Sequence, residues 1–294
     1  MEKTIKLLNE KRGRARIAYL LHSLILLTIV VMIFQGHYPL AMGLAAMALL
    51  LYIAMVRRAT REFNESFTEQ NTRLNLSRHL QNIRYEAKPG SMLGILQQDG
   101  LLPLMERGLL VYHLVSGERD GMQVSIMDAT TPVPDNAGRG QAKFLSGAWV
   151  RMVYHDARFS GKARAYSEDL YIDYDLDSFA SGIFQGTPRK NAEPAGNQHI
   201  LWLWEQEAEN LYHAARQAVS ELACYTTGDI AVAVNENACS VFIQRRFLAA
   251  PGGSLKKPVT AEMLGSDHFP ELNRVLEVGR ALLQAGCSDA LTAS

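Results

Sequence analysis

The apolar residues near the start of the chain form two long runs, one from 17 to 34 (IAYLLHSLILLTIVVMIF) and one from 40 to 56 (LAMGLAAMALLLYIAMV). At about 1.5 Å per residue the first run covers roughly 27 Å, which matches the hydrocarbon thickness of a bilayer. The two runs are separated only by QGHYP, which contains the turn residues Gly36 and Pro39. So short a connection predicts an antiparallel hairpin of two transmembrane helices, 17–34 and 40–56.

Basic residues flank this hairpin on one side only. Lys and Arg are concentrated in residues 1–16, which we expect to form a separate basic tail. Arg57, Arg58 and Arg61 follow the second run, whereas the connecting loop contains neither Lys nor Arg. The positive-inside rule then places both termini in the cytoplasm and the loop outside. Two alternatives remain: the first run as a cleaved signal peptide, which its length and the second run disfavour, and both runs as buried helices of a soluble protein.

The residues after the second run, 57–90, are polar but carry a repeating apolar position. Phe63, Phe67, Leu74, Leu80 and Ile83 recur at three-, four- and seven-residue steps, which is typical of an amphipathic helix. We therefore expect a juxtamembrane helical stalk, which ends at the KPGS sequence of residues 88–91.

From 91 to 294 the pattern changes to shorter segments that alternate or carry aromatic and β-branched residues. Residues 108–116 and 121–130 flank the turn sequence GERDG and predict a β-hairpin. Residues 141–156 predict a long strand with a bulge at Gly147, and 163–177 predict shorter strands. The Pro-, Gly- and Asn-rich residues 185–198 predict a mobile surface loop.

The remaining segments predict two helices and a second hairpin. Residues 200–225 place apolar side chains on one helical stripe, from Leu201 and Trp204 to Leu222. Residues 229–247 alternate around NEN and predict a hairpin, and 269–286 predict a closing helix. This order is not a repeated βαβ pattern. It predicts an α+β domain with a mainly antiparallel sheet, covered on one face by helices.

Charge and cysteine content narrow the class of protein. The chain has 30 Lys and Arg against 30 Asp and Glu, and this balance gives no sign of a nucleic-acid partner. Cys224, Cys239 and Cys287 lack the C-x-x-C spacing of a zinc site and are too few for a disulfide framework, so reduced thiols in a cytosolic domain are expected.

Four stretches of the chain share a pattern of apolar residues with a few glycines and aromatic residues: DGLLPLMERGLLVYHLVSGERDGMQVSIMDA, KFLSGAWVRMVYHD, LDSFASGIF and ACYTTGDIAVAVNENACSVFIQRR. In these stretches the chain resembles a bacterial family of two-span membrane proteins whose cytosolic domain has no known function. Together with the two apolar runs the four stretches cover most of the chain, but each is a hydrophobic pattern and not a catalytic signature. The resemblance implies the same topology and supplies no catalytic residues.

Three aspartates at alternate positions, Asp173, Asp175 and Asp177, are the strongest candidate chemistry. In a strand they would share one face, at about 6.6–7 Å spacing. Counted from Asp173, the sixth and twelfth positions of an EF-hand loop hold Ser178 and Phe184 instead of Gly and Glu, so that reading fails. A solvated strand face is preferred, with an acidic patch for a partner or a metal-dependent site as alternatives.

No phosphate-binding loop, nucleophile elbow or zinc-protease motif occurs in the chain. We therefore assign no catalytic, cofactor-binding or metal-binding residue and no cofactor. The expected function is that of a multi-pass plasma (inner) membrane protein whose cytosolic domain has an interaction or regulatory role. Its expected partners are the bilayer, and either another protein or a second copy of itself, but no nucleic acid. The alternative is a membrane-attached, metal-dependent hydrolase that uses Asp173, Asp175 and Asp177.

Overall fold

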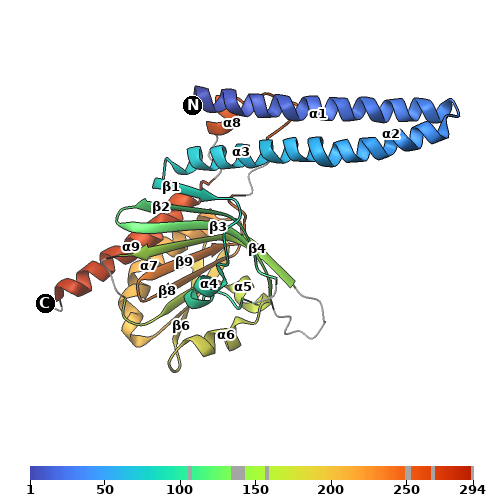
Figure 1. The fold of residues 1–294 in the computed structure, drawn as a ribbon. Helices are drawn as coiled ribbons and strands as arrows, with labels where there is room; N and C mark the ends of the chain where they lie inside the picture. Colours follow the sequence, from blue (N-terminus) through green and yellow to red (C-terminus); the bar gives the residue numbers. More distant parts are fainter. Residues whose placement is uncertain (105–107, 134–142, 156–158, 249–252, 266–268, 293–294) are drawn as a thin grey trace. The chain divides into compact units, whose positions relative to one another are not determined.

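The computed structural model describes residues 1–104, 108–133, 143–155, 159–248, 253–265 and 269–292. The chain divides into two compact units. The first contains Met1–Asn75 and Ala250–Ser266, and the second contains Leu76–Ala249 and Asp267–Ser294. The second unit holds the β-sheet, and the first is built mostly from long helices (Figure 1).

Both apolar runs lie inside longer continuous helical stretches, which are formed by helices of the first unit. The helices of this unit are α1 (Glu2–Phe34), α2 (Tyr38–Leu51), a π-helical turn η1 (Tyr52–Val56), α3 (Arg57–Leu76) and the short α8 (Ala261–Gly265). α1 and α2 lie antiparallel, joined by a turn in which Gly36 has a φ of 80° (Figure 1). Both α1 and the continuous helix Tyr38–Leu76 are long and apolar enough to cross a membrane. Residues 1–16, expected as a separate tail, are the first turns of α1.

Residues 253–265 pack on the polar ends of these helices. The Asn9 side chain accepts a hydrogen bond from the Val259 backbone N–H and donates one to the Val259 carbonyl, both at 3.0 Å. Val259 and Leu264 are buried in a small apolar cluster with Leu8, Phe63 and Phe67. The apolar stripe of α3 predicted from sequence therefore has a partner within the same unit.

The second unit contains one nine-stranded antiparallel sheet in the order β1-β2-β3-β4-β9-β8-β5-β7-β6. The two predicted hairpins are confirmed as β2–β3 and β8–β9. In the first, Asp120 and Gly121 both have positive φ, as a two-residue hairpin turn requires. The strands are β1 (Gln81–Glu86), β2 (Leu110–Arg119), β3 (Met122–Val133), β4 (Lys143–Tyr154), β5 (Ala163–Ser167), β6 (Arg189–Ala195), β7 (Gln198–Trp204), β8 (Ile230–Asn235) and β9 (Ala238–Ile243).

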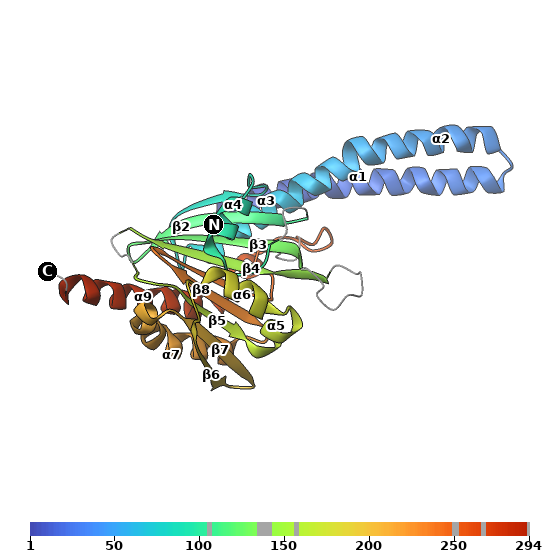
Figure 2. The ribbon, with the colours of Figure 1, turned by 90° about the horizontal axis from the view of Figure 1, so that it is seen from below.

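Helices cover both faces of this sheet. The prediction of an α+β domain is therefore confirmed, but the prediction that helices cover only one face of the sheet was wrong. Along β4, Val150 and Met152 face a core shared with α7 (Glu209–Tyr225) and α9 (Leu272–Thr292). Leu145 and Trp149 face a second core shared with α4 (Leu93–Asp99), α5 (Glu168–Asp173) and α6 (Leu176–Ile183) (Figures 1 and 2).

Three segments differ from the sequence prediction. Residues 81–86 form the edge strand β1, so the stalk helix ends at Leu76. Residues 189–195, expected in a mobile loop, form the opposite edge strand β6, where Pro194 is tolerated because an edge strand leaves half its N–H groups unpaired. Residues 200–204 belong to β7, because Trp202 and Trp204 pack into the sheet core, and the helix begins only at Glu209.

The cysteines with described side chains are free thiols, as predicted. Cys224 is exposed and Cys239 is buried in β9. Burial raises the pKa of the Cys239 thiol, so it behaves as a small apolar side chain. The side chain of Cys287 lies outside the described part.

Gly147 is not at a bulge, contrary to the sequence prediction. It pairs in regular register with Ala129 in β3. A Cβ at this position would lie 2.2 Å from the Ile243 carbonyl oxygen and 2.5 Å from the Phe242 ring. The glycine is therefore required by the close approach of β9.

Gly147→Ala should lower the stability of the second unit, because a Cβ cannot fit without moving the β9 backbone. Such overpacking costs about 1–3 kcal/mol. Urea unfolding followed by tryptophan fluorescence measures it, since Trp149 lies two residues away. Gly182→Ala, in α6 with nothing within 4 Å of its Cβ position, is the control and should be neutral or slightly stabilising. Equal stabilities for both variants would contradict the close approach.

Candidate functional site

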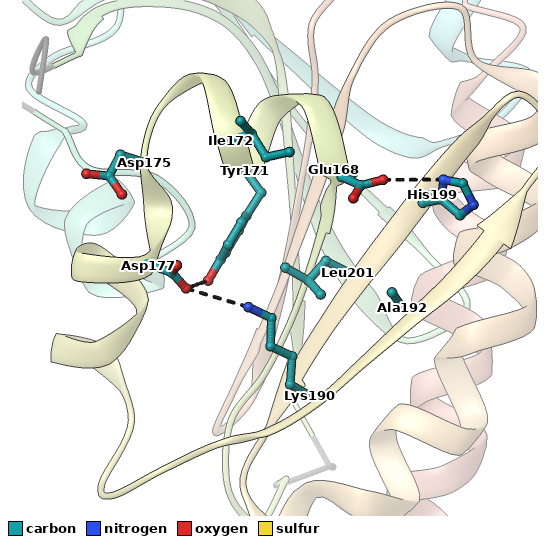
Figure 3. Close-up of a pocket in the computed structure, with 9 residues that line it drawn as sticks. All are labelled: Glu168, Tyr171, Ile172, Asp175, Asp177, Lys190, Ala192, His199 and Leu201. Atoms are coloured by element: carbon teal, nitrogen blue, oxygen red, sulfur yellow. Dashed lines mark hydrogen bonds and ion pairs between the residues drawn. The ribbon is translucent and has the colours of Figure 1, made fainter. Parts of the chain in front are cut away.

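A hollow with a volume of about 400 Å³ lies beside the β6 edge of the sheet; we call it the α5 hollow. α5 and the start of α6 form one wall, and β6 and β7 form the other (Figure 3). Two of the three candidate aspartates, Asp175 and Asp177, line it, and Asp173 does not. The lining residues are Glu168, Tyr171, Ile172, Asp175, Asp177, Lys190, Ala192, His199 and Leu201.

The aspartates do not lie on a strand, so the predicted common face is wrong. Asp173 ends α5, Asp177 lies in the first turn of α6, and Asp175 connects the two helices with a left-handed backbone (φ 46°, ψ 56°). Aspartate tolerates that conformation better than most residues. The apolar side chains Leu170 and Leu176 are buried beneath these helices, so helix packing wins over the alternation in sequence.

All three aspartates are exposed, as the preferred solvated reading expected. Among the described residues, no group of three or more His, Cys, Asp or Glu side chains is placed to hold a metal ion. The described residues therefore do not form the carboxylate cluster that the alternative of a metal-dependent hydrolase requires.

Asp177 is the centre of the polar contacts in the α5 hollow. The Tyr171 hydroxyl donates a hydrogen bond to Asp177, and Lys190 Nζ lies 3.7 Å from the same carboxylate and 5.1 Å above the Tyr171 ring (Figure 3). Burial and this hydrogen bond raise the pKa of Tyr171. The phenol therefore stays protonated near neutral pH and acts as a hydrogen-bond donor.

A second pair closes the other end of the α5 hollow. His199 Nδ1 lies 3.3 Å from Glu168 Oε2, and both side chains are more than half exposed (60% and 53%). Such a pair orients an imidazole, but a nucleophilic mechanism also needs a hydroxyl or thiol within reach. The lining residues include no Ser, Thr or Cys, and the hydroxyl of Tyr171 already donates to Asp177. The arrangement suits reversible polar contacts with a bound molecule better than covalent chemistry.

Lys190 and His199 were missed by the sequence analysis, because Lys190 was predicted in a loop and His199 fell between that loop and a predicted helix. The missed signal was the turn sequence Gly196-Asn197 between two segments of strand length. Gly196 has a φ of 63°, and the turn joins β6 to β7 as a hairpin. The charged side chains of these strands then meet those of α5 and α6, which no sequence spacing indicates.

A second polar cluster, also missed, lies beneath α4; we call it the Asp99 cluster. Arg151 Nε donates to both Asp99 carboxylate oxygens at 2.9 and 3.1 Å, and Ser240 donates to the same carboxylate. Arg164 is 1% exposed and donates to four backbone carbonyls and to Asn235. Burial lowers the pKa of Arg164, and nearby Tyr166 and Asp99 oppose the shift.

The Asp99 cluster is structural. Two of the carbonyls that accept from Arg164, those of Asp99 and Gly100, stand at the C-terminal end of α4, where the helix dipole favours a positive charge. The cluster thereby attaches α4 to β4, β5 and β8 through buried polar groups that are satisfied within the chain.

Asp99→Ala should destabilise the second unit by about 3–5 kcal/mol, because it leaves Arg151 partly buried without its counter-ion. Asp177→Ala is the matched control: its pair with Lys190 is largely exposed, so the expected loss is below about 1 kcal/mol. Urea unfolding of the purified variants checks both. Losses of similar size would show that the Asp99 cluster has no special structural role.

Comparisons of the chain with protein-family models, with curated proteins and with solved structures find no match. The resemblance to the bacterial two-span family therefore stays a prediction. The function has to be argued from the helices of the first unit and from the α5 hollow.

Proposed function

We propose that the protein is a multi-pass plasma-membrane protein whose α+β domain is a cytosolic interaction module. The observation that carries the membrane part is the exposure of large apolar side chains all round the hairpin α1–α2. Leu20 of α1 is 62% exposed and Leu50 of α2 is 67% exposed. So large an apolar surface is costly in water and is stabilised in hydrocarbon.

The charge distribution supports an orientation with both termini in the cytoplasm. Basic residues are clustered before Ile17 and after Val56, while the loop at Gln35–His37 has no Lys or Arg. The bacterial family that the chain resembles has the same proposed topology. The second unit then lies on the cytoplasmic side.

The α5 hollow supports an interaction role. Its ion pairs are largely exposed, so exchanging one for an intermolecular pair costs little. Its acidic groups, Glu168, Asp175 and Asp177, outnumber the single lysine, and Ile172 adds an apolar side chain that is 65% exposed. We therefore propose a protein segment with a basic side chain beside an apolar one as the bound partner.

The orientation predicts that a cysteine in the hairpin loop reacts from outside the cell. Gln35→Cys should be labelled in intact cells by a membrane-impermeant maleimide, because the loop is placed outside. Cys224, which is exposed on the second unit, is the internal control and should react only after lysis. Labelling of Cys224 in intact cells would contradict the proposed topology, and so would labelling of Gln35→Cys only after lysis.

The partner proposal predicts that a photo-crosslinker at position 192, in the wall of the α5 hollow, forms a specific adduct in cells. Asp177→Lys should reduce this adduct about tenfold, because it repels a basic partner segment. A crosslinker at Gln217, on the exposed face of α7, is the positional control and should not form the adduct. An adduct insensitive to Asp177→Lys, or equally strong from Gln217, would contradict binding at the hollow.

A further inference from the structure

A second hollow lies in the first unit, between α1 and the start of α3, with a volume of about 440 Å³; we call it the Arg14 groove. One wall is a single face of α1, with Arg14, Ile17, Ala18 and Leu21 at three- and four-residue spacing. The other wall is formed by Ala54 and Met55 of η1 and by Arg58, Ala59 and Glu62 of α3.

The residues of the Arg14 groove are sorted along its length. Arg14 and Arg58 are equally far along the chain from Gly36, the turn of the hairpin, so both stand at the same level of the antiparallel pair. Both mark the point where the apolar runs end. From there towards Gly36 the groove has only apolar walls, and Ile17, Leu21 and Met55 are 61%, 51% and 49% exposed.

The arginines are available to an additional anion. Arg14 has no hydrogen-bond or ion-pair partner among the described residues. Arg58 Nε binds Glu62 at 3.0 Å, but these side chains are 78% and 54% exposed, and a pair so exposed is weak and easily exchanged. A phosphate between the two guanidinium groups would gain charge-assisted hydrogen bonds from both.

We propose that the Arg14 groove is a binding site for one anionic phospholipid, with its phosphate at Arg14 and Arg58 and an acyl chain along Leu21 and Met55. The proposal rests on the proposed membrane location. Two guanidinium groups at one end and an apolar surface at the other match the phosphate and the acyl chain of a phospholipid. A free phosphate has no acyl chain to occupy the apolar end. The π-helical turn η1 supplies part of that apolar surface, and such turns are frequent at functional sites.

Another hollow of the first unit also contains two arginines, but it offers a smaller and less apolar surface to an acyl chain. The end nearer the apolar runs is lined by Tyr19, Tyr52 and Val56, two of which carry a hydroxyl group. The other end is lined by Arg57 and by the polar residues Thr60, Asn64 and Glu65. Its Arg61 binds Glu65 at 2.7 Å. We therefore assign the lipid to the Arg14 groove alone.

Native mass spectrometry of the full chain in mild detergent tests the assignment, with phosphatidylglycerol and phosphatidylcholine of the same acyl chains as probes. One molecule of phosphatidylglycerol should bind in preference to phosphatidylcholine. Inorganic phosphate at the same concentration should not displace it. Arg14→Ala and Arg58→Ala should each weaken binding about fivefold, and the double variant about 25-fold.

Arg16→Ala is the matched control, because Arg16 lies about 200° around α1 from Arg14 and does not line the groove. It should change binding less than twofold. Ala54→Trp should weaken binding without changing charge, because it covers the apolar surface from an exposed position.

Equal losses for Arg16→Ala and Arg14→Ala would overturn the site in favour of a general electrostatic attraction. Unchanged binding in Ala54→Trp would remove the apolar surface from the proposal. Carbonate extraction of membranes distinguishes failure of the proposed membrane location from failure of the proposed lipid site. Release of the chain into the supernatant refutes the membrane location itself. A chain that stays in the pellet without preferring phosphatidylglycerol refutes only the Arg14 groove.

Discussion

Burial of the nine-stranded sheet on both faces is the constraint that most of the second unit satisfies. An antiparallel sheet can leave one face in water, and its strands then alternate apolar and polar residues. Here α7 and α9 cover one face and α4, α5 and α6 the other. The central strands are consequently apolar on both sides, and β9 is buried along its whole length.

This double burial determines where polar groups can be placed. Asp99, Arg151 and Arg164 lie between the sheet and α4, where each charge or donor must find a partner inside the chain. Asp128 faces the α9 side, and there its carboxylate accepts the backbone N–H groups of Phe247 and Leu248 at 2.8 and 2.9 Å. Each of these buried groups has partners within the chain, so the groups stabilise the fold.

Segments with a strong local pattern could be predicted from the sequence, whereas those determined by the sheet could not. The turn of Asp120 and Gly121 and the long apolar runs of α1 and α2 are local signals. The strand β7 was not predicted, because its apolar run also fits a helical stripe. Only its pairing with β5 and β6 decides between a strand and a helix. The prediction that Asp173, Asp175 and Asp177 share one face of a strand failed, because α5 and α6 are too short to show a helical period in the sequence.

The charged groups left at the surface are those that can change partners. Asp177 with Lys190, and Arg58 with Glu62, are paired but largely exposed, so water and salt already weaken the attraction within the chain. Each of these pairs also borders an apolar surface, Leu201 in the α5 hollow and Met55 in the Arg14 groove. A ligand that replaces one charge and covers the neighbouring apolar atoms gains from both contacts. The Asp99 carboxylate differs, because its side chain is 4% exposed and is already bound by Arg151 and Ser240.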